Sequence, residues 1–125
     1  MLLCAKYCTI DGMDIYEENR PWGNFRRFTQ NELTTVKLLT VKAHQAFSLQ
    51  YHEKRDEFWR ILSGSPDVIV GEKRETAHTG DEFFISRGVN HRVLAGDEDA
   101  VLLEVSFGEF DEEDIVRLED DYHRV

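Results

Sequence analysis

Short β-prone runs separated by turn-forming residues fill most of this chain. They lie at residues 23–28, 34–41, 47–52, 57–63, 68–70, 82–85, 91–94 and 100–106. The segments between them are rich in Gly, Pro and Asp, the residues that break strands and form turns. Many short strands with regular turn signals predict an antiparallel all-β sandwich or barrel. Closing such a sheet removes exposed edges and leaves a cavity where inward side chains meet.

The two ends of the chain differ from this pattern. Residues 1–19 are expected to form an N-terminal leader with a short edge strand at 7–10, and residues 20–125 the β-domain. Residues 111–119 predict a short C-terminal helix, because Asp111 is a suitable N-cap and the first turn is acidic. At 125 residues the chain is expected to be one domain that buries its own core without disulfides.

The charge balance restricts what the chain can bind. Its net charge is −10, from 25 acidic and 15 basic residues, which argues against nucleic acid and anionic membranes as partners. An anionic substrate would therefore need a local basic cluster. No apolar run approaches the roughly 20 residues of a membrane span, and the N-terminus lacks signal-peptide features. A cytoplasmic location is expected, with Cys4 and Cys8 as incidental reduced thiols rather than a disulfide or metal pair.

Four side chains form a candidate metal site. Gln50 and His52 are two apart on an expected strand and so point to the same face. Residues 53–56 predict a turn, and Glu57 then opens the returning strand of a hairpin, while His91 comes from a later strand. Mixed N and O donors favour Zn²⁺, with Mn²⁺, Fe²⁺, Co²⁺ and Ni²⁺ as alternatives. The competing interpretation is a solvated turn beside hydrogen-bonded histidines.

Six motifs in a particular order resemble a known family. They are Arg20-Pro-Trp-Gly, Leu49-Gln-Tyr-His, Arg55-x-Glu57-x-Trp59, Ser63-Gly64, Gly88-Val-x-His91-Arg92 and Asp114-Ile-Val-Arg117…Glu119-Asp-Asp-Tyr122. This order resembles the type II mannose-6-phosphate isomerases, which are cupins. The resemblance implies a double-stranded β-helix, or jelly-roll barrel, with a divalent metal on Gln50, His52, Glu57 and His91. It also implies a homodimer.

The chain departs from the family pattern near these motifs. The family usually has His at the positions of Lys54 and Phe58, Pro at Ser86 and Gln at Ser106. Lys54 and Phe58 are expected beside the metal site, where they would put the exact substrate in doubt.

A sugar isomerase also needs a base, and two candidates stand out. Glu104 interrupts the apolar run 101–105, where burial would raise its pKa as a general base requires. The alternative is that Glu104 faces solvent or pairs with an arginine. Lys54, next to the metal motif, is the second candidate, and its alternative is a solvated turn lysine.

A phosphorylated sugar would also need cations and an apolar surface. The candidate phosphate-binding residues are Arg20, Lys42, Arg55, Arg87 and Arg92. Strand alternation directs Arg92 away from His91 unless a bulge intervenes. Trp59 is two residues from Glu57 and is therefore expected on the same face of the strand, where it could support a sugar ring or simply fill the core. Trp22 is expected to seal one end of the barrel.

These observations predict a metal-dependent isomerase that interconverts mannose 6-phosphate and fructose 6-phosphate through an enediol. One rival is a non-catalytic metal- and sugar-binding cupin, a sensor or accessory of polysaccharide synthesis. Another is a metal-dependent dioxygenase, against which Gln50 argues, since His-rich ligation would be expected there.

Overall fold

The protein is described by a computed structural model, which covers residues 5–10 and 13–124. The described residues form twelve strands and no helix, and every strand pairing is antiparallel. The all-β prediction is therefore confirmed. The chain divides into two compact units, residues 1–32 and 33–125, whereas the sequence placed a boundary after residue 19.

The first unit contains one three-stranded sheet in the order β1-β2-β3. Its strands are β1 (Ala5–Ile10), β2 (Met13–Arg20) and β3 (Gly23–Arg27). The sequence did not predict β2, because its Glu17-Glu18-Asn19 stretch is poor in strand-forming side chains. Cys4 lies outside the described residues, as do the side chains of residues 5–10.

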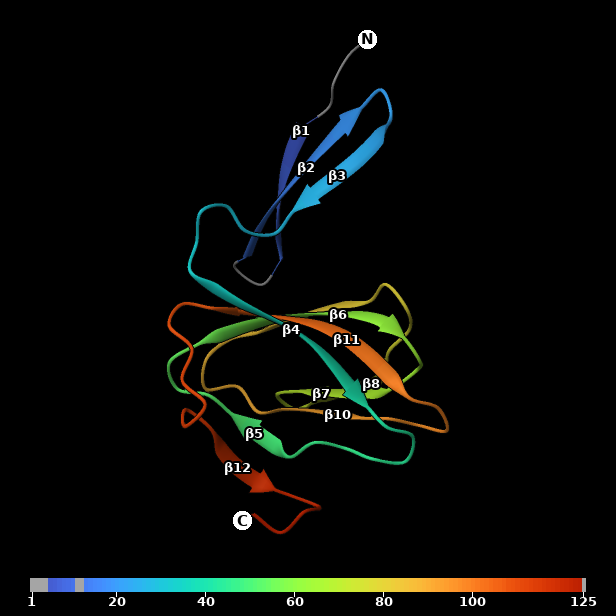
Figure 1. Cartoon of the computed structure of the whole chain (residues 1–125), viewed down its shortest axis with the longest axis vertical. Coiled ribbons are helices and arrows are strands. Elements are labelled where there is room, and N and C mark those ends of the chain that lie inside the picture. The colour runs from blue at the N-terminus through green and yellow to red at the C-terminus, as the bar shows by residue number, and fades with distance from the viewer. Residues whose placement is uncertain (1–4, 11–12, 125) are drawn as a thin grey trace. The chain divides into compact units, whose positions relative to one another are not determined.

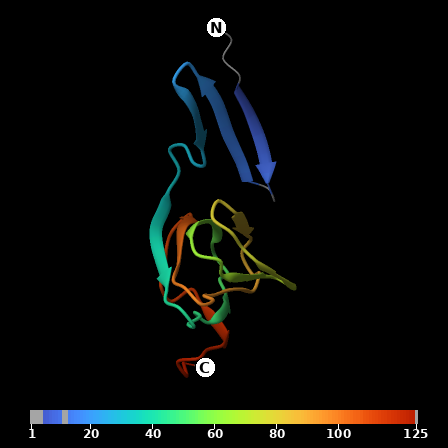
Figure 2. The same ribbon diagram turned by 90° about the vertical axis from the view of Figure 1, so that its right-hand side faces the viewer.

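The second unit is a sandwich of two sheets that face each other (Figures 1 and 2). One sheet has the order β4-β11-β6-β9, formed by β4 (Thr34–Val41), β11 (Ala100–Phe107), β6 (Asp56–Ser63) and β9 (Glu82–Ile85). The other has the order β12-β5-β10-β7-β8, formed by β12 (Val116–Glu119), β5 (Leu49–Tyr51), β10 (His91–Leu94), β7 (Asp67–Val70) and β8 (Lys73–Thr76).

An apolar core lies between these two sheets. It is built from inward side chains of both, which alternate with outward ones along each strand. The buried members are Val41, Trp59, Ile61, Val68, Ala77, Ile85, Val93, Ala95, Ala100 and Leu102. One member of this core, Trp59, also packs against His91.

The C-terminal helix predicted for residues 111–119 is wrong. Residues 111–115 form turns and loop, and residues 116–119 form β12, which pairs with β5. An acidic residue of this segment does stabilise local structure, since the Asp114 carboxylate accepts hydrogen bonds from the backbone N–H groups of Glu53 and Lys54 at 2.9 and 3.0 Å. Pairing with the edge of the sheet outweighs the helix-capping signal, which local sequence alone had favoured.

The predicted hairpin between Gln50 and Glu57 is also wrong. β5 pairs with β10 and β12, whereas β6 pairs with β11 and β9, so the two strands belong to opposite sheets. The turn at residues 53–56 therefore carries the chain across the sandwich. As a result Gln50 and Glu57 face each other across the interior instead of lying side by side.

Candidate metal centre

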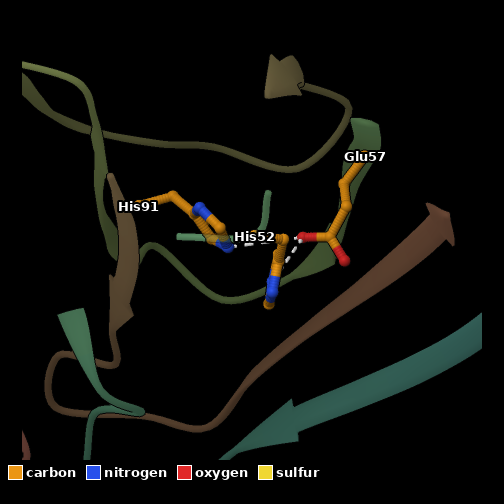
Figure 3. A group of neighbouring side chains, drawn as sticks. All are labelled: His52, Glu57 and His91. Atoms are coloured by element: carbon orange, nitrogen blue, oxygen red, sulfur yellow. Dashed lines mark ion pairs between the residues drawn. The ribbon is translucent and has the colours of Figure 1, made fainter. Parts of the chain in front are cut away.

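Three buried side chains converge inside the sandwich, as Figure 3 shows. His52 directly follows β5, Glu57 lies in β6 and His91 begins β10. One ligand atom from each lies within 4.8 Å of the other two. All three residues are at most 2% exposed. Burial of two imidazoles and a carboxylate in an apolar sandwich requires that their polar atoms be compensated.

The histidine tautomers follow from their backbone contacts. Nδ1 of His52 lies 2.6 Å from the carbonyl oxygen of Asp114, and Nδ1 of His91 lies 2.9 Å from that of Val89. A carbonyl can only accept, so both rings carry a proton on Nδ1 and donate it there. The other ring nitrogen, Nε2, of each histidine therefore faces the cluster.

Glu57 is oriented in the same way through one of its two oxygens. Oε2 accepts from Ser106 Oγ at 3.1 Å and from Arg55 Nε at 3.2 Å. Oε1 lies 3.5 Å from Nε2 of His52 and 3.3 Å from Nε2 of His91. The outer contacts thus fix the carboxylate and direct Oε1 at the histidines.

Two of these facing atoms have no hydrogen-bond partner within the described part of the chain: Glu57 Oε1 and His91 Nε2. Burial acts to raise the pKa of Glu57, but hydrogen bonds and positive charge from His52 and His91 hold it well below its usual range. A cation bound here would replace these histidine protons, with the Glu57 carboxylate and the Nε2 lone pairs of the two imidazoles as its ligands. Such an arrangement of electron-pair donors fits a divalent cation, with N and O ligands of the kind that Zn²⁺ accepts.

Gln50 lies beside this cluster. Its register partner across the sheet is His91, and its Nε2 is 3.5 Å from Nε2 of His52. Its Oε1 accepts from Ser48 Oγ at 2.6 Å. Because amide O and N are interchanged by a half-turn of the amide group, Gln50 can present an oxygen to the same centre.

A pocket of about 880 Å³ opens onto the cluster, a size typical of small-molecule sites. Gln50, His52 and Glu57 line it, together with Glu104 and Arg55. Glu104 is 7% exposed and accepts Trp59 Nε1 at 3.1 Å. Burial raises the pKa of Glu104, and the nearby charge of Glu57 raises it further. Glu104 thus faces the pocket instead of solvent.

The alternation of side chains along β6 explains where Trp59 and Phe58 lie. Trp59 is fully buried behind the pocket, and its ring packs edge-on against His91 with centroids 5.4 Å apart. Phe58 is register-paired with Val105 and Phe84. It lies on the opposite face of β6 from Glu57, because successive strand residues alternate. The expectation that Phe58 flanks the metal site is therefore wrong.

Lys54, Arg87 and Arg92, which the sequence singled out, are not among the residues that line the pocket. Lys54 is exposed, and Arg87, whose Nε is 3.5 Å from Asp56 Oδ1, has a side chain that is 60% exposed. Arg92 is held by the Phe47 carbonyl, Glu119 and Asp121. Arg20 belongs to the first unit, where it pairs with Glu18. Trp22 is also in that unit and is 72% exposed.

Arg55 is the predicted substrate-binding arginine that the structure brings to the pocket. It is buried, and besides Glu57 it contacts Nε2 of His52 at 3.2 Å and the carbonyl oxygen of Asp111 at 3.0 Å. Its charge therefore neutralises and positions the metal-ligand carboxylate. Three further cationic residues of the pocket, Lys37, Arg117 and Arg124, were not among the predicted site residues. Lys37 could have been found, since it alternates with apolar residues along β4.

Comparisons with known proteins agree with this geometry. Residues 12–120 match the family described as "Mannose-6-phosphate isomerase C-terminal". The xanthan biosynthesis protein XanB of Xanthomonas campestris is 37% identical over 107 residues, which cover 84% of this chain and 23% of that protein. Mannose-1-phosphate guanylyltransferase 2 of Escherichia coli O157:H7 is 34% identical over 105 residues, covering 82% of this chain and 22% of that protein. The chain thus spans about a quarter of the length of these curated relatives.

The fold has solved counterparts as well. A protein with a double-stranded β-helix domain from Klebsiella pneumoniae superposes with a TM-score of 0.62 at 17% identity, covering 73% of this chain and 78% of that one. Within the described residues, no helix is long and apolar enough to cross a membrane. The second unit is therefore a cupin barrel, and the chain belongs to the mannose-6-phosphate isomerase C-terminal family.

Proposed function

We propose that this chain is a metal-dependent aldose–ketose isomerase that interconverts mannose 6-phosphate and fructose 6-phosphate. The observation that supports it most directly is the arrangement of two functional groups in one pocket. His52 and Glu57 of a buried His-Glu-His cluster suited to a divalent cation line the same pocket as Glu104, a buried carboxylate with a raised pKa.

The proposed reaction moves one proton between neighbouring carbons. A base takes the proton from C2 of the open-chain aldose, the electron pair forms a C1–C2 double bond, and the C1 oxygen gains a proton to give an enediol. Return of a proton to C1, with loss of the proton on the C2 oxygen, gives the ketose. A bound divalent cation would polarise the sugar oxygens and stabilise the negative charge that develops on them.

Glu104 is the residue we assign as the base. Its raised pKa, caused first by burial and then by the charge of Glu57, makes the carboxylate a better proton acceptor than an exposed one. The hydrogen bond from Trp59 Nε1 to Oε2 fixes the group and leaves Oε1 for the substrate. Lys54 is a weaker choice because its side chain is exposed and lies outside the pocket lining.

Two of the departures from the family pattern, Lys54 and Phe58, lie outside the pocket lining. Lys54 contacts Asp114 through its backbone N–H, and Phe58 faces away from the cluster. Ser106 takes a supporting role, since its hydroxyl donates to the ligand carboxylate of Glu57. This placement favours the isomerase over the non-catalytic alternative, because the replaced residues lie outside the pocket lining.

The test is a coupled assay with mannose 6-phosphate, on protein freed of metal and then reloaded with Zn²⁺, Mn²⁺ or Co²⁺. We expect turnover with metal, together with exchange of the C2 hydrogen in heavy water. His52→Ala should lose both the metal and the turnover. Glu104→Gln should keep its metal and KM while kcat falls by about 10²–10⁴-fold, the range of general acid–base contributions.

Glu109→Gln is the matched control, since it removes an exposed carboxylate just beyond the same strand. The outcome that contradicts the proposal is a metal-loaded protein that binds mannose 6-phosphate without exchange or turnover. That result would support a non-catalytic sugar-binding cupin instead.

A further inference from the structure

Five cationic side chains line the pocket: Lys37, Lys42, Arg55, Arg117 and Arg124. They form the local basic cluster that an anionic ligand needs in a chain of net charge −10. Three of them are engaged with the protein. Arg55 holds Glu57, Arg124 donates to both carboxylate oxygens of Asp120, and Lys37 lies 3.4 Å from Glu112.

Arg117 differs from these three. Its Nε is buried, yet it has no hydrogen-bond partner among the described residues. A guanidinium donor removed from water and left unsatisfied is strongly unfavourable, so such a group calls for an acceptor. The pocket that Arg117 lines is where a ligand could supply one.

The position of Arg117 relative to the metal centre follows from strand register. β12 pairs with β5 so that Arg117 is opposite Gln50. Paired residues of an antiparallel sheet project to the same face, with Cβ atoms about 4.5–5.5 Å apart. The side chain of Arg117 therefore begins beside Gln50, which adjoins the His-Glu-His cluster. Its long side chain can contact one end of a ligand whose other end lies at the cluster.

We infer that Arg117 binds the phosphate group of the substrate. The inference rests on the proposed function, in which the reacting carbons C1 and C2 lie at the metal centre and Glu104. The phosphate at C6 is the far end of that chain. The planar guanidinium offers two parallel N–H groups that match two phosphate oxygens, which a lysine cannot do. Arg87 and Arg92, the other arginines of this unit that the sequence suggested, lie outside the pocket lining.

Calorimetric titration of the metal-loaded protein tests this assignment. Mannose 6-phosphate, mannose and inorganic phosphate serve as the three probes. Arg117→Gln should weaken binding of mannose 6-phosphate and of inorganic phosphate by about 10- to 100-fold, the effect of losing a charged hydrogen-bonded pair. Binding of unphosphorylated mannose should be unchanged. Arg117→Lys should fall between wild type and Arg117→Gln.

The matched control is Arg74→Gln, which removes an exposed arginine that pairs with Asp67 on the β7–β8 hairpin. It should leave all three affinities unchanged. In steady-state assays Arg117→Gln should raise KM with kcat almost constant, and elemental analysis should find its metal content equal to wild type. Should Arg117→Gln not fold, Arg117→Lys still has to show weakened phosphate binding.

The results separate this inference from the proposed function. Turnover by wild type with equal KM and equal phosphate affinity in Arg117→Gln would overturn the role of Arg117 alone. If phosphate binding depends on Arg117 but the protein shows neither turnover nor C2 exchange, the role of Arg117 is supported and the proposed isomerase activity is rejected. A wild-type protein that binds neither mannose 6-phosphate nor inorganic phosphate would overturn the inference.

Discussion

At the residue scale, Glu104 combines burial with a nearby negative charge. Both raise its pKa above the ordinary value of 4.5. A group whose folded-state pKa is raised stabilises the fold fully below its unfolded-state pKa, and that contribution is lost as pH rises through the folded-state pKa. Ionised Glu104 therefore reduces stability at neutral pH, which is consistent with a group retained for chemistry.

Glu104→Gln should for this reason be more stable than wild type at neutral pH in the metal-free protein. Gln cannot ionise and still accepts the Trp59 N–H. The difference in unfolding free energy should shrink toward acid pH and level off below about pH 4, near the unfolded-state pKa of Glu. Urea unfolding of both proteins across this range measures it. A difference that does not change with pH would contradict the raised pKa of Glu104.

A second prediction at this scale concerns Ser106, whose hydroxyl donates to Oε2 of Glu57. Ser106→Ala should weaken metal binding by about 10- to 100-fold, because outer contacts orient the ligand carboxylate. Competition titration with a chelating dye measures the affinity. Ser63→Ala, at the exposed end of β6, is the control. Equal metal affinity in the Ser106 and Ser63 variants would show that Arg55 alone suffices to orient Glu57.

At the element scale, the connection between β6 and β7 depends on a glycine. Gly64 has φ +85°, and a Cβ there would lie 2.5 Å from the carbonyl oxygen of Asp99. Gly88 has a similar φ of +81°, but a Cβ there would have no atom within 4 Å. The two positions thus share the left-handed backbone conformation, but only at Gly64 does the backbone of Asp99 and Ala100, where β11 begins, approach closely.

Alanine substitution at both positions separates these effects. Gly88→Ala should cost about 1–2 kcal/mol, the usual penalty of an L-residue in the left-handed region. Gly64→Ala should cost about 1–3 kcal/mol more, because the clash is with backbone and cannot be relieved by a rotamer change. Denaturant unfolding compares the two variants. Equal losses would mean that the β11 backbone moves freely away from Gly64.

At the scale of the whole molecule, the barrel has an apolar core made of other residues than the metal cluster, although Trp59 of the core packs against His91. Ten buried hydrophobic residues form it, and none of them is a candidate ligand. Chelation should therefore leave the β-sheet circular dichroism intact, unlike the unfolding of a zinc finger. The melting temperature should fall, since a bound ion at 100 times its Kd adds about 2.7 kcal/mol.

Thermal melts with chelator, and after metal is restored, check this expectation. Recovery of the original melting temperature with added metal is the control for irreversible damage. Loss of the β-sheet signal on chelation would indicate that the cluster is part of the folding core.

Several features were determined by the sequence alone. The strands at 34–41, 82–85 and 91–94 have the predicted bounds, because alternating side chains and flanking turn residues act within a few neighbours. The order of the short motifs was sufficient to predict the cupin fold, which the comparisons confirm. It also singled out His52, Glu57 and His91, which the structure brings together.

What the sequence could not determine depends on contacts between distant segments. Strand β12 forms because β5 offers an unpaired edge, an interaction that local capping signals at Asp111 could not reveal. Glu57 meets His52 across the sandwich and not along a hairpin, because the choice of sheet partner is made by the whole barrel. The unpartnered Nε of Arg117 exists only once β12 is paired and the pocket is enclosed. Burial and register are properties of the assembled sheets. Tertiary structure alone therefore decided which Lys and Arg side chains line the pocket.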